Sequence, residues 1–261
     1  MNEPKLFADG AAYERLMGRW SRPFGAQFLD WLALPNGLSW LDVGCGNGAF
    51  TETVIARCAP GAITGVDPSE GQLAYARSRA EGKQAQFRIA DAQNLPFADH
   101  SYDVATMALV ITFVPDPAKG VAEMKRVVRP GGTVAAYMWD IPGGGIPLAP
   151  LLAAMQSLGV PTGSRNPEIS RLESLHALWQ QAGLHDVDAR VIRIPVVFPN
   201  FDDLWNSATL DTGPAGSVLR SQPPEVVEKV RARLRELAPA GADGRIVREA
   251  FVNAVKGRVA A

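Results

Sequence analysis

The stretch Leu41-Asp42-Val43-Gly44-Cys45-Gly46-Asn47-Gly48 decides the fold class of this chain. It joins a short apolar run at residues 38–43 to a helical pattern at residues 50–58, which predicts a strand, a glycine turn and a helix. Glycines let such a turn bend tightly and bring backbone groups against a ligand at the carboxyl edge of a sheet. They also occur where a helix merely packs closely on a strand, so a purely structural role stays open.

Strands and helices alternate on both sides of this turn. Residues 1–37 read as helical, with Phe24, Phe28, Leu29 and Leu32 at helical spacing. After the first helix, the pattern predicts strands at 62–66, 85–89, 103–107 and 133–138, with helices at 70–80 and 118–128. The sequence Arg129-Pro130-Gly131-Gly132 is expected to stop the second of these helices. Apolar strands alternating with helices predict an α/β fold, a parallel sheet covered on both faces.

Beyond Trp139 the pattern becomes irregular. Residues 141–150 contain three prolines and three consecutive glycines and predict a loop. The sequence Ser170-Arg171-Leu172-Glu173 has the form of a capping box and predicts a helix that runs to about residue 182. Strands are expected at 187–198 and 246–255.

The organisation that follows has three parts. We expect an N-terminal helical arm at 1–37, a core domain at 38–198 and 241–261, and a helical insert at 199–240. The insert carries one apolar stripe and stands between the last two strands, so we read it as a cover for a substrate rather than a separate domain.

Composition limits the classes of function. The 261 residues include 26 basic and 27 acidic side chains, a balance that argues against a nucleic-acid partner. Cys45 and Cys58, the two cysteines, form neither a disulfide framework nor a zinc motif, so we expect a reducing compartment and no metal. Because no signal peptide or membrane span is evident, we expect a cytoplasmic protein, a monomer or homodimer.

The charges around the glycine turn limit the kinds of ligand that it can bind. Asp42 stands two residues before Gly44, where it would repel a pyrophosphate but would suit a cationic ligand such as S-adenosylmethionine (SAM). The glycines at 44, 46 and 48 are one residue short of the G-x-G-x-x-G spacing of dinucleotide loops. A nicotinamide-dependent oxidoreductase is therefore disfavoured.

Two further carboxylates follow predicted strands. Asp67 ends the second strand, where a carboxylate can accept hydrogen bonds from both ribose hydroxyls of a nucleoside. It also precedes a helix, so it can act as an N-terminal carboxylate as well. Asp91 follows the third strand and can accept from an adenine amino group, or it is simply a turn residue.

Four motifs in order make the chain similar to a known family. They are LDVGCGNG at 41–48, GVDPSEGQL at 65–73, ADAQNLPFADHSYD at 90–103 and RVVRPGG at 126–132. Together they resemble the class I SAM-dependent methyltransferases, in the group that includes the ubiquinone and menaquinone biosynthesis C-methyltransferases. Residues 13–23 and 201–205 resemble this group more loosely.

The resemblance implies a Rossmann-like sheet of seven strands, mostly parallel with the last strand antiparallel, and SAM as the cofactor. The loop at 44–48 would wrap the methionine moiety, Asp67 would bind the ribose and Asp91 the adenine, while Met107 would lie beside the sulfonium. The implied cofactor-binding residues are Asp42, Gly44, Cys45, Gly46, Gly48, Asp67, Pro68, Gln72, Asp91, Ala92, Met107 and, in the N-terminal arm, Tyr13, Arg19 and Trp20.

Two departures from the family concern the site. Gln72 stands where many relatives have a methionine that packs on the adenine, and Ile111-Thr112 stands where relatives often have a histidine. Methyl transfer from a sulfonium needs alignment and exclusion of water, and a base only if the nucleophile arrives protonated. The sequence names no such base, and we expect the three histidines, His100, His176 and His185, to lie outside the site.

The function expected is C- or O-methylation of a small, partly apolar molecule. The aromatic residues Trp179, Phe198, Phe201 and Trp205 either line the acceptor pocket or pack in the core. A SAM-binding protein of the same fold without transferase activity is the alternative.

Overall fold

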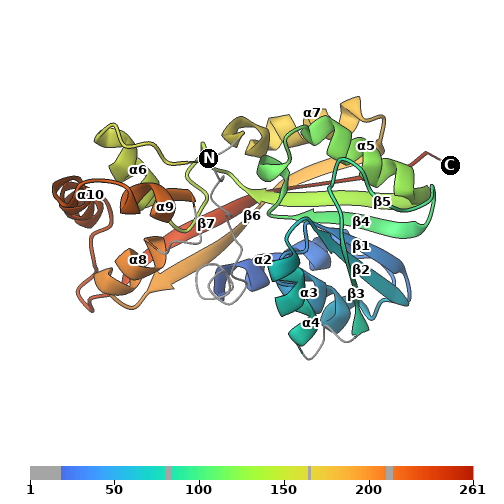
Figure 1. Cartoon of the computed structure of the whole chain (residues 1–261), viewed down its shortest axis with the longest axis horizontal. Coiled ribbons are helices and arrows are strands. Elements are labelled where there is room, and N and C mark those ends of the chain that lie inside the picture. Colours follow the sequence, from blue (N-terminus) through green and yellow to red (C-terminus); the bar gives the residue numbers. More distant parts are fainter. Residues whose placement is uncertain (1–18, 80–83, 164–165, 210–213, 261) are drawn as a thin grey trace.

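A seven-stranded sheet forms the centre of the molecule (Figure 1). The computed structural model describes residues 19–79, 84–163, 166–209 and 214–260. The strands are β1 (Ser39–Val43), β2 (Ala62–Asp67), β3 (Gln86–Ile89), β4 (Tyr102–Ala108), β5 (Val128–Trp139), β6 (His185–Phe198) and β7 (Ile246–Arg258), in the spatial order β3-β2-β1-β4-β5-β7-β6. The first five pair in parallel, and β7 is antiparallel to both β5 and β6. The expected Rossmann-like topology is confirmed.

Helices cover both faces of this sheet (Figure 1). One face carries α2 (Arg19–Leu32), α3 (Ala49–Cys58) and α4 (Glu70–Ser78), and the other carries α5 (Pro117–Val127) and α7 (Leu172–Gln181). Two 3₁₀ turns, η3 (Ile111–Phe113) and η4 (Pro167–Ser170), lie in connections. In the described part of the chain, no helix combines the length and apolar character needed to cross a membrane.

Helix α2 belongs to the core. Phe24 and Phe28 are fully buried, and the Phe28 ring lies 4.7 Å from that of Tyr137 in β5, measured between centroids. Burying each such ring contributes roughly 1.5–3 kcal/mol. The helical spacing read from the sequence is confirmed, since Leu29 and Leu32 are buried as well.

Strands β6 and β7 extend past the rest of the sheet. The last β5–β7 pair is Trp139 with Val252, whereas β6–β7 pairing continues to Phe198 with Ile246. Residues 246–251 therefore project roughly 20 Å beyond the carboxyl edge, at about 3.3 Å per residue. Figure 1 shows the remaining helices gathered along this two-stranded extension.

These accessory helices come from two parts of the sequence. They are α6 (Ala149–Ser157), α8 (Phe201–Ala208), α9 (Pro214–Arg220) and α10 (Pro224–Leu237). Helix α6 precedes β6 in the chain yet packs against α10, so the accessory layer is larger than the 199–240 insert. The buried side chains Leu151 and Met155 belong to α6 and were not assigned a role from the sequence.

Two local expectations were wrong. Helix α7 has Arg171 as its N-cap, with no side-chain capping bond. Ser170 instead donates from Oγ to the carbonyl of Pro167 at 2.5 Å and accepts from the Ile141 amide at 3.1 Å. Its hydroxyl therefore binds the loop that follows β5 and does not cap α7. Strand β5 begins at Val128 rather than after residue 132, because an irregularity in its pairing with β4 accommodates Pro130, which has no amide to donate.

Candidate cofactor site

The glycine loop lies between β1 and α3, at the carboxyl edge of the sheet. Its path is fixed by the Gly44 and Cys45 amides, which both donate to the Val66 carbonyl of β2 at 2.7 and 2.9 Å. A Cβ at Gly44 would lie 2.6 Å from the Val110 side chain, so that glycine serves close packing. At Gly46 (φ +51°) the nearest atom to such a Cβ is Gln72 Oε1 at 3.9 Å, so the loop faces open space there. Gly46 is thus the position where a ligand can approach the backbone.

Asp42 is a buried carboxylate directly behind this loop. Its side chain is 1% exposed, and Oδ2 accepts a hydrogen bond from Thr51 Oγ1 at 2.6 Å. Oδ1 is buried and accepts no hydrogen bond. Burial raises the pKa of Asp42 to about 7, the Thr51 hydrogen bond opposes this, and the charge of Asp67 adds to it. A positively charged ligand beside the loop would compensate this group, which fits SAM.

Asp67 ties the loop to the next helix. Its Oδ2 accepts from the Gly46 amide at 3.0 Å and its Oδ1 from the Ser69 amide at 2.8 Å. Burial raises the pKa of this carboxyl, while both backbone hydrogen bonds lower it. Each oxygen keeps lone-pair capacity for a ribose hydroxyl. Asp67 therefore accepts from the amide of Ser69, the N-cap of α4, and ribose binding stays compatible with this contact.

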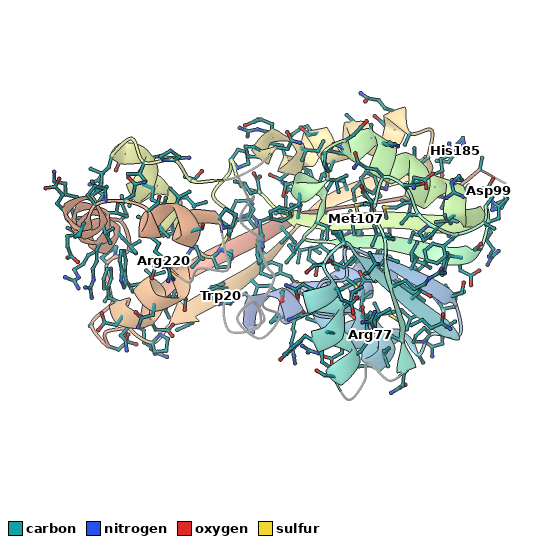
Figure 2. The ribbon with its side chains drawn as sticks, viewed as in Figure 1. Trp20, Arg77, Asp99, Met107, His185 and Arg220 are labelled. Carbon is teal, nitrogen blue, oxygen red and sulfur yellow. The ribbon has the colours of Figure 1, made fainter. Side chains whose placement is uncertain are left out.

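The other residues expected to bind the cofactor differ in how deeply they are buried. Cys45, Gln72 and Met107 are buried beside the loop, at the start of α4 and in β4, and Figure 2 places Met107 in the middle of the sheet. Pro68 and Asp91 are exposed. Asp91 Oδ1 accepts from the Gln93 amide at 2.9 Å, the geometry of the turn alternative.

Asp91 nevertheless lies near Asp67. Ala90 donates its amide to the Asp67 carbonyl at 3.3 Å, and half-buried Ala92 follows at the same edge. The structure therefore brings the three carboxyl-edge carboxylates and the glycine loop into one region, as the sequence predicted.

Comparison with known proteins agrees with this geometry. A family model described as a methyltransferase domain matches residues 41–136. A demethylmenaquinone methyltransferase from Desulfitobacterium hafniense is 40% identical over 105 residues, which cover 38% of this chain and 42% of that protein. The ubiquinone/menaquinone biosynthesis C-methyltransferase of Paracoccus denitrificans is 44% identical over 110 residues, or 40% of this chain and 43% of that protein. The matched region, residues 41–136, is thus similar to the methyltransferase domain of class I SAM-dependent enzymes.

The likeness in structure extends further than the likeness in sequence. A putative methyltransferase from Bacillus halodurans superposes with a TM-score of 0.62 at 18% identity, over 91% of this chain and 99% of that one, and so shares the fold. The chain spans less than half the length of the curated relatives named above. The matched family region ends at residue 136, before the accessory helices of this chain.

Two of the three N-terminal residues expected to contact the cofactor lie within the described part of the chain. Tyr13 lies outside the described residues, and Arg19 is the first residue of α2. Trp20 is buried and packs edge-on against Phe198 of β6, with 5.3 Å between ring centroids. Figure 2 shows Trp20 between the sheet and the accessory helices. Cofactor contact by these three residues stays a prediction.

The four aromatic residues proposed for the acceptor pocket have different places. Trp179 is fully buried, and its Nε1 donates to the Val134 carbonyl at 2.9 Å, so it is a core residue. Phe198 is also fully buried. Phe201 and Trp205 are half-buried on α8, where guanidinium groups of α10 lie over their rings.

The histidines lie away from the glycine loop. His185 pairs with Arg258 at the amino edge of the parallel strands, and His100 lies in the turn before β4 with Nδ1 3.1 Å from the Val128 carbonyl oxygen. His176 lies in α7, which covers the sheet face opposite α3.

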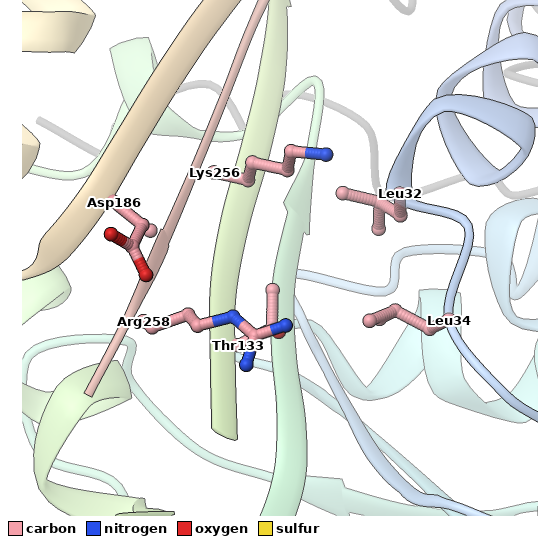
Figure 3. Close-up of a pocket in the computed structure, with 7 residues that line it drawn as sticks. Leu32, Leu34, Thr133, Asp186, Lys256 and Arg258 are labelled. Atoms are coloured by element: carbon pink, nitrogen blue, oxygen red, sulfur yellow. The ribbon is translucent and has the colours of Figure 1, made fainter. Parts of the chain in front are cut away.

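A cavity of about 130 Å³ also lies at the amino edge (Figure 3). Its lining residues are Leu32, Leu34, Thr133, Asp186, Lys256, Gly257 and Arg258. Because Thr133 and Arg258 mark the end of the sheet opposite the glycine loop, this cavity is separate from the cofactor site.

One polar residue of the projecting β7 strand has no role predicted from the sequence. Arg248 of β7 donates from Nη2 to the Gly144 carbonyl at 3.0 Å, and its Nε is buried without a hydrogen bond. Burial lowers the pKa of its guanidinium. The available signal was alternation, because residues 246–252 place Arg248 on the same face as Ile246 and Ala250.

Proposed function

We propose that this protein transfers a methyl group from SAM to a small-molecule acceptor, by C- or O-methylation. The observation that carries the proposal is the buried Oδ1 of Asp42, without a hydrogen-bond partner, behind a loop that faces open space at Gly46. An uncompensated buried carboxylate favours a cationic ligand at that place.

The chain's own residues would bind and orient the reactants. SAM, when bound, supplies an electrophilic methyl on a sulfonium whose departure leaves a neutral thioether. The glycine loop would hold the methionine moiety with Asp42 behind it, and Asp67 would accept from the ribose. Ala108, half-buried at the end of β4, would lie beside the reacting atoms. Alignment and exclusion of water supply most of the catalysis in such a displacement.

The accessory helices would exclude that water. Arg231 lies 5.4 Å from the ring centroid of Trp205 and pairs with Asp202 at 3.3 Å, and Arg235 lies 4.2 Å from the ring centroid of Phe201. These contacts join α10 to α8, and such stacked pairs contribute roughly 0.5–2 kcal/mol each. We infer that α6 and the 199–240 insert together cover a partly apolar acceptor.

A SAM-binding protein without transferase activity is the second candidate. Ile111 and Thr112, where relatives often have a histidine, are both buried, and Thr112 Oγ1 lies 3.9 Å from Met138 Sδ. Neither side chain is a base. Transfer would then require an acceptor that is already nucleophilic, such as a phenolate or an enolate.

Binding and turnover can be tested together. Calorimetry with SAM, its demethylated product S-adenosylhomocysteine (SAH) and NAD should give binding of the first two and none of NAD. Incubation with [methyl-³H]SAM and a panel of phenols, hydroquinones and 1,3-dicarbonyl compounds should then transfer label. Binding without transfer to any of them supports the second candidate, and tight binding of NAD would contradict both.

A further inference from the structure

Arg248 occupies a buried-face position on the projecting part of β7. It pairs with Val196 of β6, and its neighbours on the same face, Ile246 and Ala250, are buried. Val247 is 65% exposed and Glu249 is exposed, so they face the other way. A guanidinium on the apolar side of a two-stranded ribbon needs a reason.

The charge of Arg248 is uncompensated within the described residues. No carboxylate of those residues forms a salt bridge with its guanidinium, which donates a hydrogen bond to the neutral Gly144 carbonyl. Glu249 instead forms a salt bridge with Arg193, with 2.7 Å between Oε1 and Nη1. Asp140, at the start of the loop that carries Gly144, accepts from the Gly143 amide at 2.7 Å.

An unpaired, desolvated charge destabilises a fold by several kcal/mol, and an apolar side chain is often better tolerated there. Arginine is the side chain whose planar fork binds a carboxylate through two parallel hydrogen bonds. Here Nε is buried and has no acceptor among the described residues, so a carboxylate that reached this edge of the fork would satisfy it. One arginine matches one negative charge, which favours a monoanionic carboxylate over a phosphate.

The position of Arg248 fits the acceptor rather than the cofactor. Ala108 at the end of β4 pairs with Tyr137, which pairs with Ala254 of β7. Arg248 lies six residues further along β7, roughly 20 Å at about 3.3 Å per residue. This part of β7 runs from the carboxyl edge of the sheet towards the accessory helices (Figure 1).

We propose that Arg248 binds a carboxylate at the far end of an elongated, partly apolar methyl acceptor. The proposal rests on the methyltransferase function proposed above and specifies its substrate class. The reacting atom lies at the end of β4 and the carboxylate at the projecting ribbon, so the acceptor is oriented by its charge. Arg248 is a specificity-determining residue and takes no part in bond making.

The test measures binding with defined probes on the full chain saturated with SAH. The probes are hexanoate, octanoate and decanoate, each compared with its primary amide by calorimetry. Charge-assisted hydrogen bonds contribute about 1.5–3 kcal/mol, so at least one carboxylate should bind about tenfold or more tighter than its amide. Arg248→Gln should reduce that ratio to about one, and Arg248→Lys should keep part of it.

Two controls separate recognition from folding. Arg193→Gln removes the same charge from the exposed face of the same ribbon and should leave the carboxylate preference unchanged. The affinity of Arg248→Gln for SAH should stay close to that of the parent. Its Tm should not fall and should rise if the unpaired charge strains the fold, because the guanidinium has no charged partner to lose.

The outcomes are distinct. Equal binding of every acid and its amide by the parent chain, or an undiminished preference in Arg248→Gln, overturns the proposal while SAH binding keeps the proposed function intact. A loss of Tm and SAH affinity in both Arg248 variants, with the preference retained, would show a purely structural role at Gly144. Failure of the parent to bind SAH overturns both.

Discussion

Asp42→Asn tests the buried carboxylate on which the cofactor site depends. Asparagine keeps the shape and can still accept from Thr51 Oγ1, but it carries no charge. The pKa of Asp42 is raised by burial from 3.8 to about 7, so the folded, ligand-free protein prefers this group protonated. The stability that protonation gives is complete below pH 3.8 and is lost as the pH rises through about 7.

The size of the effect follows from the shift. A difference of about three pH units, at about 1.4 kcal/mol per unit, corresponds to as much as about 4 kcal/mol. The ligand-free parent should therefore lose up to about that much unfolding free energy between pH 4 and pH 8 through this one group. Asp42→Asn should lack this loss and should be the more stable protein at pH 8.

SAM binding should show the opposite preference. If the ionised carboxylate pairs with the cation, binding of SAM to the parent below about pH 7 must release a proton. The affinity for SAM should then decrease as the pH is lowered, by up to about tenfold for each pH unit. Asp42→Asn should bind SAM more weakly at pH 8, with little pH dependence. Urea unfolding at pH values from about 4 to about 8 measures the stability profile, and calorimetry in two buffers of different ionisation enthalpy measures the proton release. Parallel stability profiles and equal SAM affinities would refute the role given to Asp42.

Three further variants test other parts of the site. Asp67→Ala should weaken SAM binding by roughly tenfold to a hundredfold, since a charged acceptor of hydrogen bonds is lost; unchanged affinity by calorimetry would remove it from the site. Gly46→Val should abolish SAM binding, whereas Gly37→Val, also at positive φ (+81°) with nothing within 4 Å of a Cβ, should cost only stability. Replacing residues 199–245 by a short hairpin turn, with Leu151 and Met155 of α6 changed to glutamine, should spare SAM binding and abolish methyl transfer. If that variant folds but no longer binds SAM, the cofactor site has been assigned to the wrong half of the molecule.

The sequence determined the cofactor half of this protein. The glycine loop, the strands that lead into Asp42 and Asp67, and the alternation of strand and helix are local patterns, because strand period, helix period and glycine turns depend on neighbouring residues. The antiparallel last strand came from resemblance and was confirmed by the pairing of β7 with β5.

The accessory half, built from α6 and the 199–240 insert, was decided by tertiary structure. The Ser170 hydroxyl binds the amide of Ile141, 29 residues earlier, instead of capping α7. Helix α6 packs against α10, although β6 separates the two helices in the sequence. Trp179 is a core residue, and its indole can be buried because Nε1 donates a hydrogen bond to the Val134 carbonyl of β5. Arg248 became conspicuous only when the described residues around it offered no carboxylate to pair with. Burial and pairing depend on residues far apart in the chain, so local periodicity predicts which face a side chain occupies but not which partner it meets there.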